Sequence, residues 1–186
     1  HRDLHRRRRS FPTRRSSDLP RKALPGDLLY LAGDRWGRTG AAIRAHYEGR
    51  SLEGFPKIRE AAFYPLPRLE LLALSGLLRG SLDSSDGLAE TLWQLADLGV
   101  GVEVEALPLY PDVLAFAGSE EAALELVLYG GEEFEAVLVV PQEGAAAVEA
   151  RAKAKGLPLF RAGRVVAGEG VYLRGAPLPR KGYAHF

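Results

Sequence analysis

Residues 83–87, with the sequence DSSDG, are the stretch best suited to chemistry, because two carboxylates stand three residues apart on a turn with two hydroxyls. Mg²⁺ in phosphate-transferring sites takes one or two carboxylates together with waters and substrate phosphates. A helix is expected directly after this turn, and the free N–H groups at a helix start favour an anionic phosphate. The pattern is therefore compatible with a magnesium and phosphate site. The alternative is that Asp86 or Ser85 only caps the helix.

Residues 130–135, with the sequence GGEEFE, form a second candidate. Glycines let a ligand approach the backbone closely, and Glu132, at the start of an expected strand, could accept hydrogen bonds from a substrate amine. The alternative is purely structural. The two glycines would end a helix, and the acidic side chains of the strand would face water.

A third candidate is the C-terminal sequence KGYAHF, residues 181–186. Its aromatic residues, Tyr183 among them, could offer a flat face to a heteroaromatic ring. The alternative is that this chain end simply packs against the domain.

Several familiar sites are excluded. The sequence contains no cysteine, no G-x-x-x-x-G-K-[ST] loop, no H-E-x-x-H pair and no G-x-S-x-G motif. No apolar run reaches the roughly 18 to 20 residues that a membrane-spanning helix needs. The first 20 residues lack the apolar core of a signal peptide. We therefore expect a cytoplasmic protein without a membrane partner.

Strand-like and helix-like segments alternate from residue 20 onward. The expected strands are 27–32, 100–105, 134–140, 159–166 and 170–173, the last two as a pair, and the expected helices are 38–47, 68–78, 87–98, 120–129 and 143–155. Residues 48–67 contain three prolines and are expected to be a long connection with little regular structure. This order predicts an α/β or α+β fold in which helices flank a sheet.

The charge is divided unevenly along the chain. Residues 1–22 carry a net charge of +7, whereas the remainder carries −6. Residues 11–19 (FPTRRSSDL) resemble the in-frame translation of a widely used sequencing-library adapter. We therefore interpret residues 1–19 as a non-native or disordered basic tail and expect no nucleic-acid partner. The alternative is a genuine basic arm that binds nucleic acid.

In this order, the three motifs resemble the thiamine-monophosphate kinase family. That family shows D-x-S-D-G, then G-G-E-D-Y-E-L, and a C-terminal G-aromatic-x-H-F. Two further matches are the Pro-Gly-Asp of residues 25–27 and the Pro-Leu-Pro-Arg of residues 65–68. The similarity extends from about Ala23 to Phe186. Glu133 and Phe134 replace the usual Asp and Tyr, and Tyr183 stands where the family often has Trp.

The resemblance implies the C-terminal domain of the aminoimidazole-ribonucleotide synthetase-like fold. Residues 20–67 would then be a remnant of the interdomain region with a first strand and helix, and residues 68–186 the C-terminal α/β domain. The family's N-terminal half, which forms the homodimer and holds most metal ligands, is missing from this sequence. The resemblance therefore implies that the fragment alone is inactive.

The implied activity is the Mg²⁺-assisted transfer of the γ-phosphoryl group of ATP to thiamine monophosphate, which gives thiamine diphosphate. By resemblance, Asp83 and Asp86 would bind Mg²⁺, Ser85 would contact ATP, and Glu132 and Tyr183 would contact thiamine monophosphate. Two alternatives stay open: another ATP-dependent synthetase of the same superfamily, and a non-catalytic α/β binding domain.

Overall fold

The computed structural model describes residues 22–64 and 67–181, and these residues form one seven-stranded sheet with helices around it. The sheet order is β2-β4-β1-β5-β3-β6-β7, and every neighbouring pair is antiparallel except β3 and β6. The strands are β1 Leu28–Ala32, β2 Gly80–Asp83, β3 Gly101–Val104, β4 Ala136–Val140, β5 Leu159–Val166, β6 Val171–Leu173 and β7 Ala176–Pro177. The helices are α1 Arg38–Glu48, α2 Pro56–Phe63, α3 Leu88–Ala96, α4 Pro111–Ala117, α5 Glu120–Tyr129 and α6 Ala145–Ala154, with 3₁₀ helices η1 Leu69–Leu77 and η2 Gln142–Gly144.

The two strands richest in aliphatic residues pair with each other inside the sheet. Every residue of β1 (LLYLA) and β4 (AVLVV) is buried, and their register places Leu28 opposite Val140 and Ala32 opposite Ala136. Continuous apolar runs of this kind are typical of strands that are covered on both faces. The sheet flanked by helices that we predicted is therefore confirmed.

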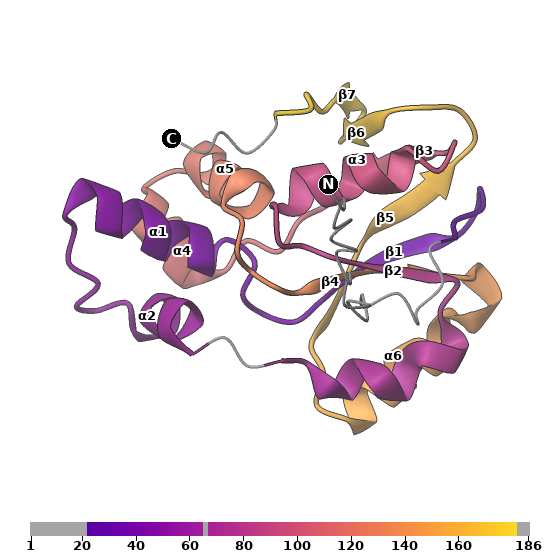
Figure 1. Ribbon diagram of the computed structural model, residues 1–186, viewed down its shortest axis with the longest axis horizontal. Coiled ribbons are helices and arrows are strands. Elements are labelled where there is room, and N and C mark those ends of the chain that lie inside the picture. The colour runs from indigo at the N-terminus through magenta and orange to yellow at the C-terminus, as the bar shows by residue number, and fades with distance from the viewer. Residues whose placement is uncertain (1–21, 65–66, 182–186) are drawn as a thin grey trace, which may run out of the picture.

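Different helices cover the two faces, and Figure 1 shows α3 and α6 on opposite sides of the sheet. On one face, Leu29 and Leu31 of β1 share a buried cluster with Leu92 of α3. On the other face, Leu28 and Tyr30 share a cluster with apolar side chains of α6 and η1. A third cluster joins α1, α2, α4 and α5, which gather beyond one end of the strands.

Two predictions about the elements were wrong. The segment 48–67 is not mostly irregular, because α2 begins at Pro56, a residue whose fixed φ suits the first helical turn. The strands 159–166 and 170–173 are not a pair, because β3 lies between β5 and β6. The expected helix 68–78 is present, although it is the nine-residue 3₁₀ helix η1. The short helix α4, which begins at Pro111, was not predicted.

The segment before residue 68 contributes to the middle of the sheet. β1 lies between β4 and β5, so residues on both sides of position 68 build the same sheet. The predicted basic tail, residues 1–19, lies outside the described residues. Within the described ranges, no helix combines the length and the apolar character needed to cross a membrane.

Candidate functional site

The first two motifs lie side by side, although about 45 residues separate them in the sequence. β2, which ends at Asp83, pairs with β4, which begins at Ala136. Beyond the strand ends, the backbone N–H of Ser84 donates to the carbonyl of Glu135 at 2.9 Å, and the N–H of Glu132 donates to the carbonyl of Ser85 at 2.9 Å. Backbone hydrogen bonds therefore join the DSSDG turn to the GGEEFE segment.

The two hydrogen bonds are out of step by two residues, so Glu133 and Phe134 form a bulge. Glu132 has a φ of 61° and Phe134 a φ of 50°. Positive φ is costly for side chains of this size and is concentrated at functional sites. The bulge turns Glu133 inward, where it is fully buried, and leaves Phe134 53% exposed. It therefore places an aromatic ring on the surface close to the exposed Glu132.

Asp83 and Asp86 present uncommitted carboxylates. Both side chains are exposed, and neither forms an ion pair or a side-chain hydrogen bond within residues 22–64 and 67–181. The N-cap of α3 is Gly87, and no side chain caps this helix. The alternative in which Asp86 or Ser85 serves only as a helix cap is therefore wrong.

A side chain of α3 stabilises the DSSDG turn. The Thr91 hydroxyl donates to the carbonyls of Asp83 at 3.2 Å and Gly87 at 3.1 Å. Gly87 has a φ of 93°, and a Cβ there would lie 3.2 Å from the Leu128 carbonyl oxygen. A glycine is thus required where the turn passes the end of α5.

The donor set of the turn fits Mg²⁺ only in combination with other ligands. In the described part of the chain, no group of three or more acidic or histidine side chains could hold a metal ion. Two free carboxylates at Asp83 and Asp86 match the usual protein share of a Mg²⁺ site, which substrate phosphates and waters complete. This chain can therefore supply part of a magnesium site.

Glu133 and Glu135 contradict the view that this strand turns its acidic side chains to water, since both are buried. No group in the described residues donates a well-formed hydrogen bond to either carboxylate oxygen of Glu133. Burial raises the pKa of Glu133 well above its ordinary value, and the charges of Glu135 and Glu132 add to the rise. The backbone N–H groups of Glu133 and Gly37 lie close to the carboxylate and lower its pKa, which offsets part of this rise.

Glu135, in contrast, is fully partnered. The Arg68 guanidinium donates to both of its oxygens and also pairs with Asp34. The backbone N–H groups of Asp34 and Arg35 each approach Glu135 Oε1 at 3.3 Å. The hydrogen bonds from Arg68 to Glu135 and, to a smaller extent, to Asp34 raise the pKa of Arg68 above its ordinary value, against the effect of burial. This ion cluster around the buried Glu135 fixes the start of β4 and, through the Glu135 carbonyl, the DSSDG turn.

The first glycine of the second motif, Gly130, serves packing. Helix α5 ends at Tyr129, as the structural interpretation of the motif predicted. A Cβ on Gly130 would lie 2.7 Å from Gly40 Cα and 2.4 Å from the Leu126 carbonyl oxygen. The backbones of α1 and of the end of α5 therefore touch at a pair of glycines.

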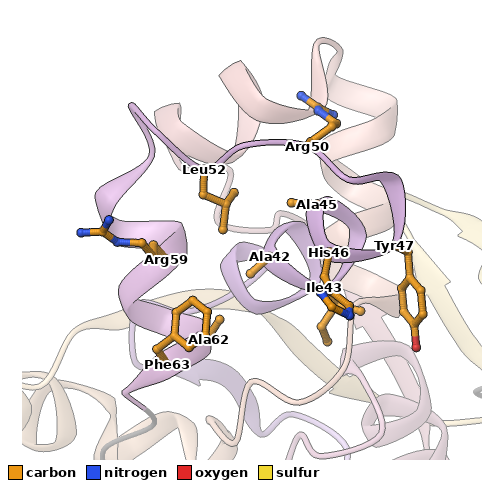
Figure 2. Close-up of a pocket in the computed structure, with 10 residues that line it drawn as sticks. All are labelled: Ala42, Ile43, Ala45, His46, Tyr47, Arg50, Leu52, Arg59, Ala62 and Phe63. Atoms are coloured by element: carbon orange, nitrogen blue, oxygen red, sulfur yellow. The ribbon is translucent and has the colours of Figure 1, made fainter.

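The structure brings together Asp83, Ser85, Asp86 and Glu132, but Tyr183 lies outside the described residues. Neither Phe134 nor the Arg68–Glu135 pair was predicted to have a role, although all three residues lie in motifs that the sequence shows. The sequence signal for Phe134 was a bulky aromatic residue between two glutamates, Glu133 and Glu135. A separate apolar hollow of about 530 Å³ lies between α1 and α2, and Figure 2 shows that none of these candidate residues lines it.

The sheet order, the flanking helices and the joined motifs define a known class of protein. The family described as AIR synthase related protein, C-terminal domain, matches residues 25–176. The chain belongs to this family. The family-level resemblance inferred from the three motifs is thereby confirmed.

Several proteins similar to this chain are thiamine-monophosphate kinases. The enzyme of Pyrobaculum calidifontis is 34% identical over 169 residues, which cover 87% of this chain and 51% of that protein. The crystal structure of thiamine-monophosphate kinase from Stenotrophomonas maltophilia K279a matches with a TM-score of 0.79 at 27% identity, covering 86% of this chain and 54% of that chain. AaThiL complexed with AMPPCP and TMP matches with a TM-score of 0.73 at 25% identity, covering 88% and 52%. The chain spans about half the length of the relatives it matches.

Proposed function

We propose that this domain, joined to the half that its relatives possess, phosphorylates thiamine monophosphate to thiamine diphosphate with ATP. The observation that carries the proposal is the hydrogen-bonded contact between the DSSDG turn and the GGEEFE segment. It joins the segment that carries Asp83 and Asp86 to the segment that carries Glu132, and all three carboxylates are exposed. A relative of similar fold binds an ATP analogue and TMP together, which supports the same pair of substrates here.

In the proposed reaction, an oxygen of the thiamine monophosphate phosphate forms a bond to the γ-phosphorus of ATP. The bond from that phosphorus to the β–γ bridging oxygen breaks, and ADP leaves. Asp83 and Asp86 would hold Mg²⁺, which neutralises phosphate charge when bound. Ser85, at the start of the turn before α3, would contact the nucleotide.

The substrate's cationic, heteroaromatic character suits the second motif. Glu132 is an exposed carboxylate that can face the positive thiazolium ring or accept from the aminopyrimidine. Phe134 adds an exposed aromatic face near Glu132, and Tyr183 would add another from the C-terminus. Homodimer formation through the other half is part of the same proposal, as is the inactivity of residues 1–186 alone.

The test uses the full-length protein and measures thiamine diphosphate formation over a range of Mg²⁺ concentrations. Asp83→Asn and Asp86→Asn should each lower kcat/KM about 100-fold, which is about 2.7 kcal/mol of transition-state stabilisation. Asp97→Asn, just past the far end of α3, is the matched control and should change it little. Unchanged activity in both turn variants would refute the metal-binding role and favour a non-catalytic binding domain.

A further inference from the structure

A second, polar hollow of about 190 Å³ lies where the β1–α1 connection, α2 and Arg68 meet. Four cationic side chains line it, Arg35, Arg38, Lys57 and Arg68, together with the carboxylates of Asp34 and Glu60. The hollow is separate from the DSSDG turn. Glu135 lies between them, with its carbonyl bonded to the turn and its carboxylate bonded to Arg68.

Two of the four cations are already neutralised. Arg38 donates to both oxygens of Asp112, at 2.8 and 3.1 Å. Arg68 is held by Glu135 and by Asp34, so the carboxylate of Asp34 is also compensated. Neither guanidinium therefore needs a further counter-charge.

The guanidinium of Arg35 is less completely partnered than those of Arg38 and Arg68. Its side chain is only 9% exposed, its Nη2 donates to the Tyr64 carbonyl at 3.3 Å, and its Nε lies 4.0 Å from Glu135 Oε1. Its Nη1 is buried and has no hydrogen-bond partner among residues 22–64 and 67–181. A buried, charged donor without an acceptor is costly, and a bound anion would remove that cost.

Lys57 supplies the second spare charge. Its side chain is exposed on the first turn of α2 and forms no ion pair with any residue that the structure describes. Glu60, one helical turn further along α2, is the one lining carboxylate without an ion pair in these ranges. A hydrogen phosphate has both the oxygens to accept from Arg35 and Lys57 and a hydroxyl to donate to Glu60.

We propose that this hollow binds a phosphate group, held chiefly by Arg35 and Lys57. A tetrahedral oxyanion suits the site because its donors, Arg35 and Lys57, come from separate segments, whereas a carboxylate is planar and offers only two oxygens. The site does not depend on the proposed kinase activity. Its ligand is either inorganic phosphate or the phosphate of a larger molecule.

The test is calorimetric titration of the 186-residue chain with orthophosphate at constant ionic strength. Lys57→Gln and Arg35→Gln should each weaken binding about tenfold, as expected for the loss of one hydrogen bond to a charged group. Arg59→Gln is the matched control, because Arg59 is exposed on the same helix and lines the apolar hollow instead (Figure 2). It should bind as the unaltered chain does, and the basic tail is identical in every variant.

Titration with thiamine monophosphate and with thiamine distinguishes the two sources. Tighter binding of thiamine monophosphate than of orthophosphate, lost in Lys57→Gln, would assign the pocket to the phosphate of a larger ligand. Equal binding of the two would assign it to the inorganic ion. Orthophosphate binding that is absent, or equal in Lys57→Gln and the unaltered chain, would overturn the proposal. Circular dichroism checks that Arg35→Gln is folded, and Lys57→Gln decides the matter if it is not.

Discussion

The guanidinium of Arg68 holds both carboxylate oxygens of the buried Glu135, with Nη2 2.8 Å from Oε1 and Nε 3.0 Å from Oε2. This pair joins a residue just before η1 to the last residue of the GGEEFE segment, which directly precedes β4. Because the Glu135 carbonyl also accepts from Ser84, the pair supports the turn that carries Asp83 and Asp86.

Arg68→Met should therefore destabilise the domain by about 3 kcal/mol, because it leaves the charge of Glu135 buried without its main partner. Urea denaturation of the chain measures the effect. Arg180→Met removes an exposed guanidinium from Glu90 and Asp97 and should shift the midpoint little. Equal shifts in the two variants would show that the Arg68–Glu135 pair contributes no more than a surface ion pair.

Gly33 is required for Glu135 to reach its position. A Cβ on Gly33 would lie 1.9 Å from Glu135 Oε2, and the residue has a φ of 96°. Gly99 has a similar φ of 87° with open space around it. Gly99→Ala should cost only the backbone strain, about 1 to 2 kcal/mol, whereas Gly33→Ala should cost about 2 kcal/mol more from the steric conflict. Thermal unfolding of both variants compares these costs, and indistinguishable losses would contradict the contact.

The buried Glu133 should make stability depend on pH. Because its pKa is raised in the folded state, the folded chain binds this proton more tightly than the unfolded chain does. Its contribution to stability is fully present below the unfolded pKa of about 4.3 and is lost as pH rises through the folded pKa. In Glu133→Gln the free energy of unfolding should fall less steeply with pH between the unfolded pKa and the raised folded pKa of Glu133. Parallel pH profiles for the two proteins would show that Glu133 does not titrate abnormally.

Phe134 should contribute to binding of the substrate rather than to the chemical step. In the full-length protein, Phe134→Ala should raise the KM for thiamine monophosphate about fivefold, the equivalent of about 1 kcal/mol of cation–π contact, with kcat little changed. Phe63→Ala removes another exposed phenylalanine, on α2, and should leave KM unchanged. A fall in kcat without a change in KM would argue against substrate contact by Phe134.

The sequence predicted those elements whose apolar residues form a continuous run, such as β1 and β4, or recur at helical spacing, as in α3. It missed α2 and α4, because short helices that begin at a proline look like loops when prolines are read as breakers. It also placed β5 beside β6, because nothing in the local pattern shows that β3 inserts between them.

The sequence indicated candidate residues for the site but not how they are arranged. The motifs indicated Asp83, Asp86 and Glu132. Only the antiparallel pairing of β2 with β4 brings the two segments that carry these residues next to each other. The bulge at Glu133 and Phe134 was not predictable, because it requires positive φ at residues that rarely adopt it. The burial of Glu135 depends on Arg68, 67 residues earlier in the chain, and such a contact leaves no local signal.

The most direct test of the account is to incubate the full-length protein with ATP, Mg²⁺ and thiamine monophosphate and to quantify the products by chromatography. The account predicts thiamine diphosphate and ADP in equal amounts, with neither formed when thiamine monophosphate is left out. ATP consumption that does not depend on thiamine monophosphate, or a phosphorylated product other than thiamine diphosphate, would contradict it.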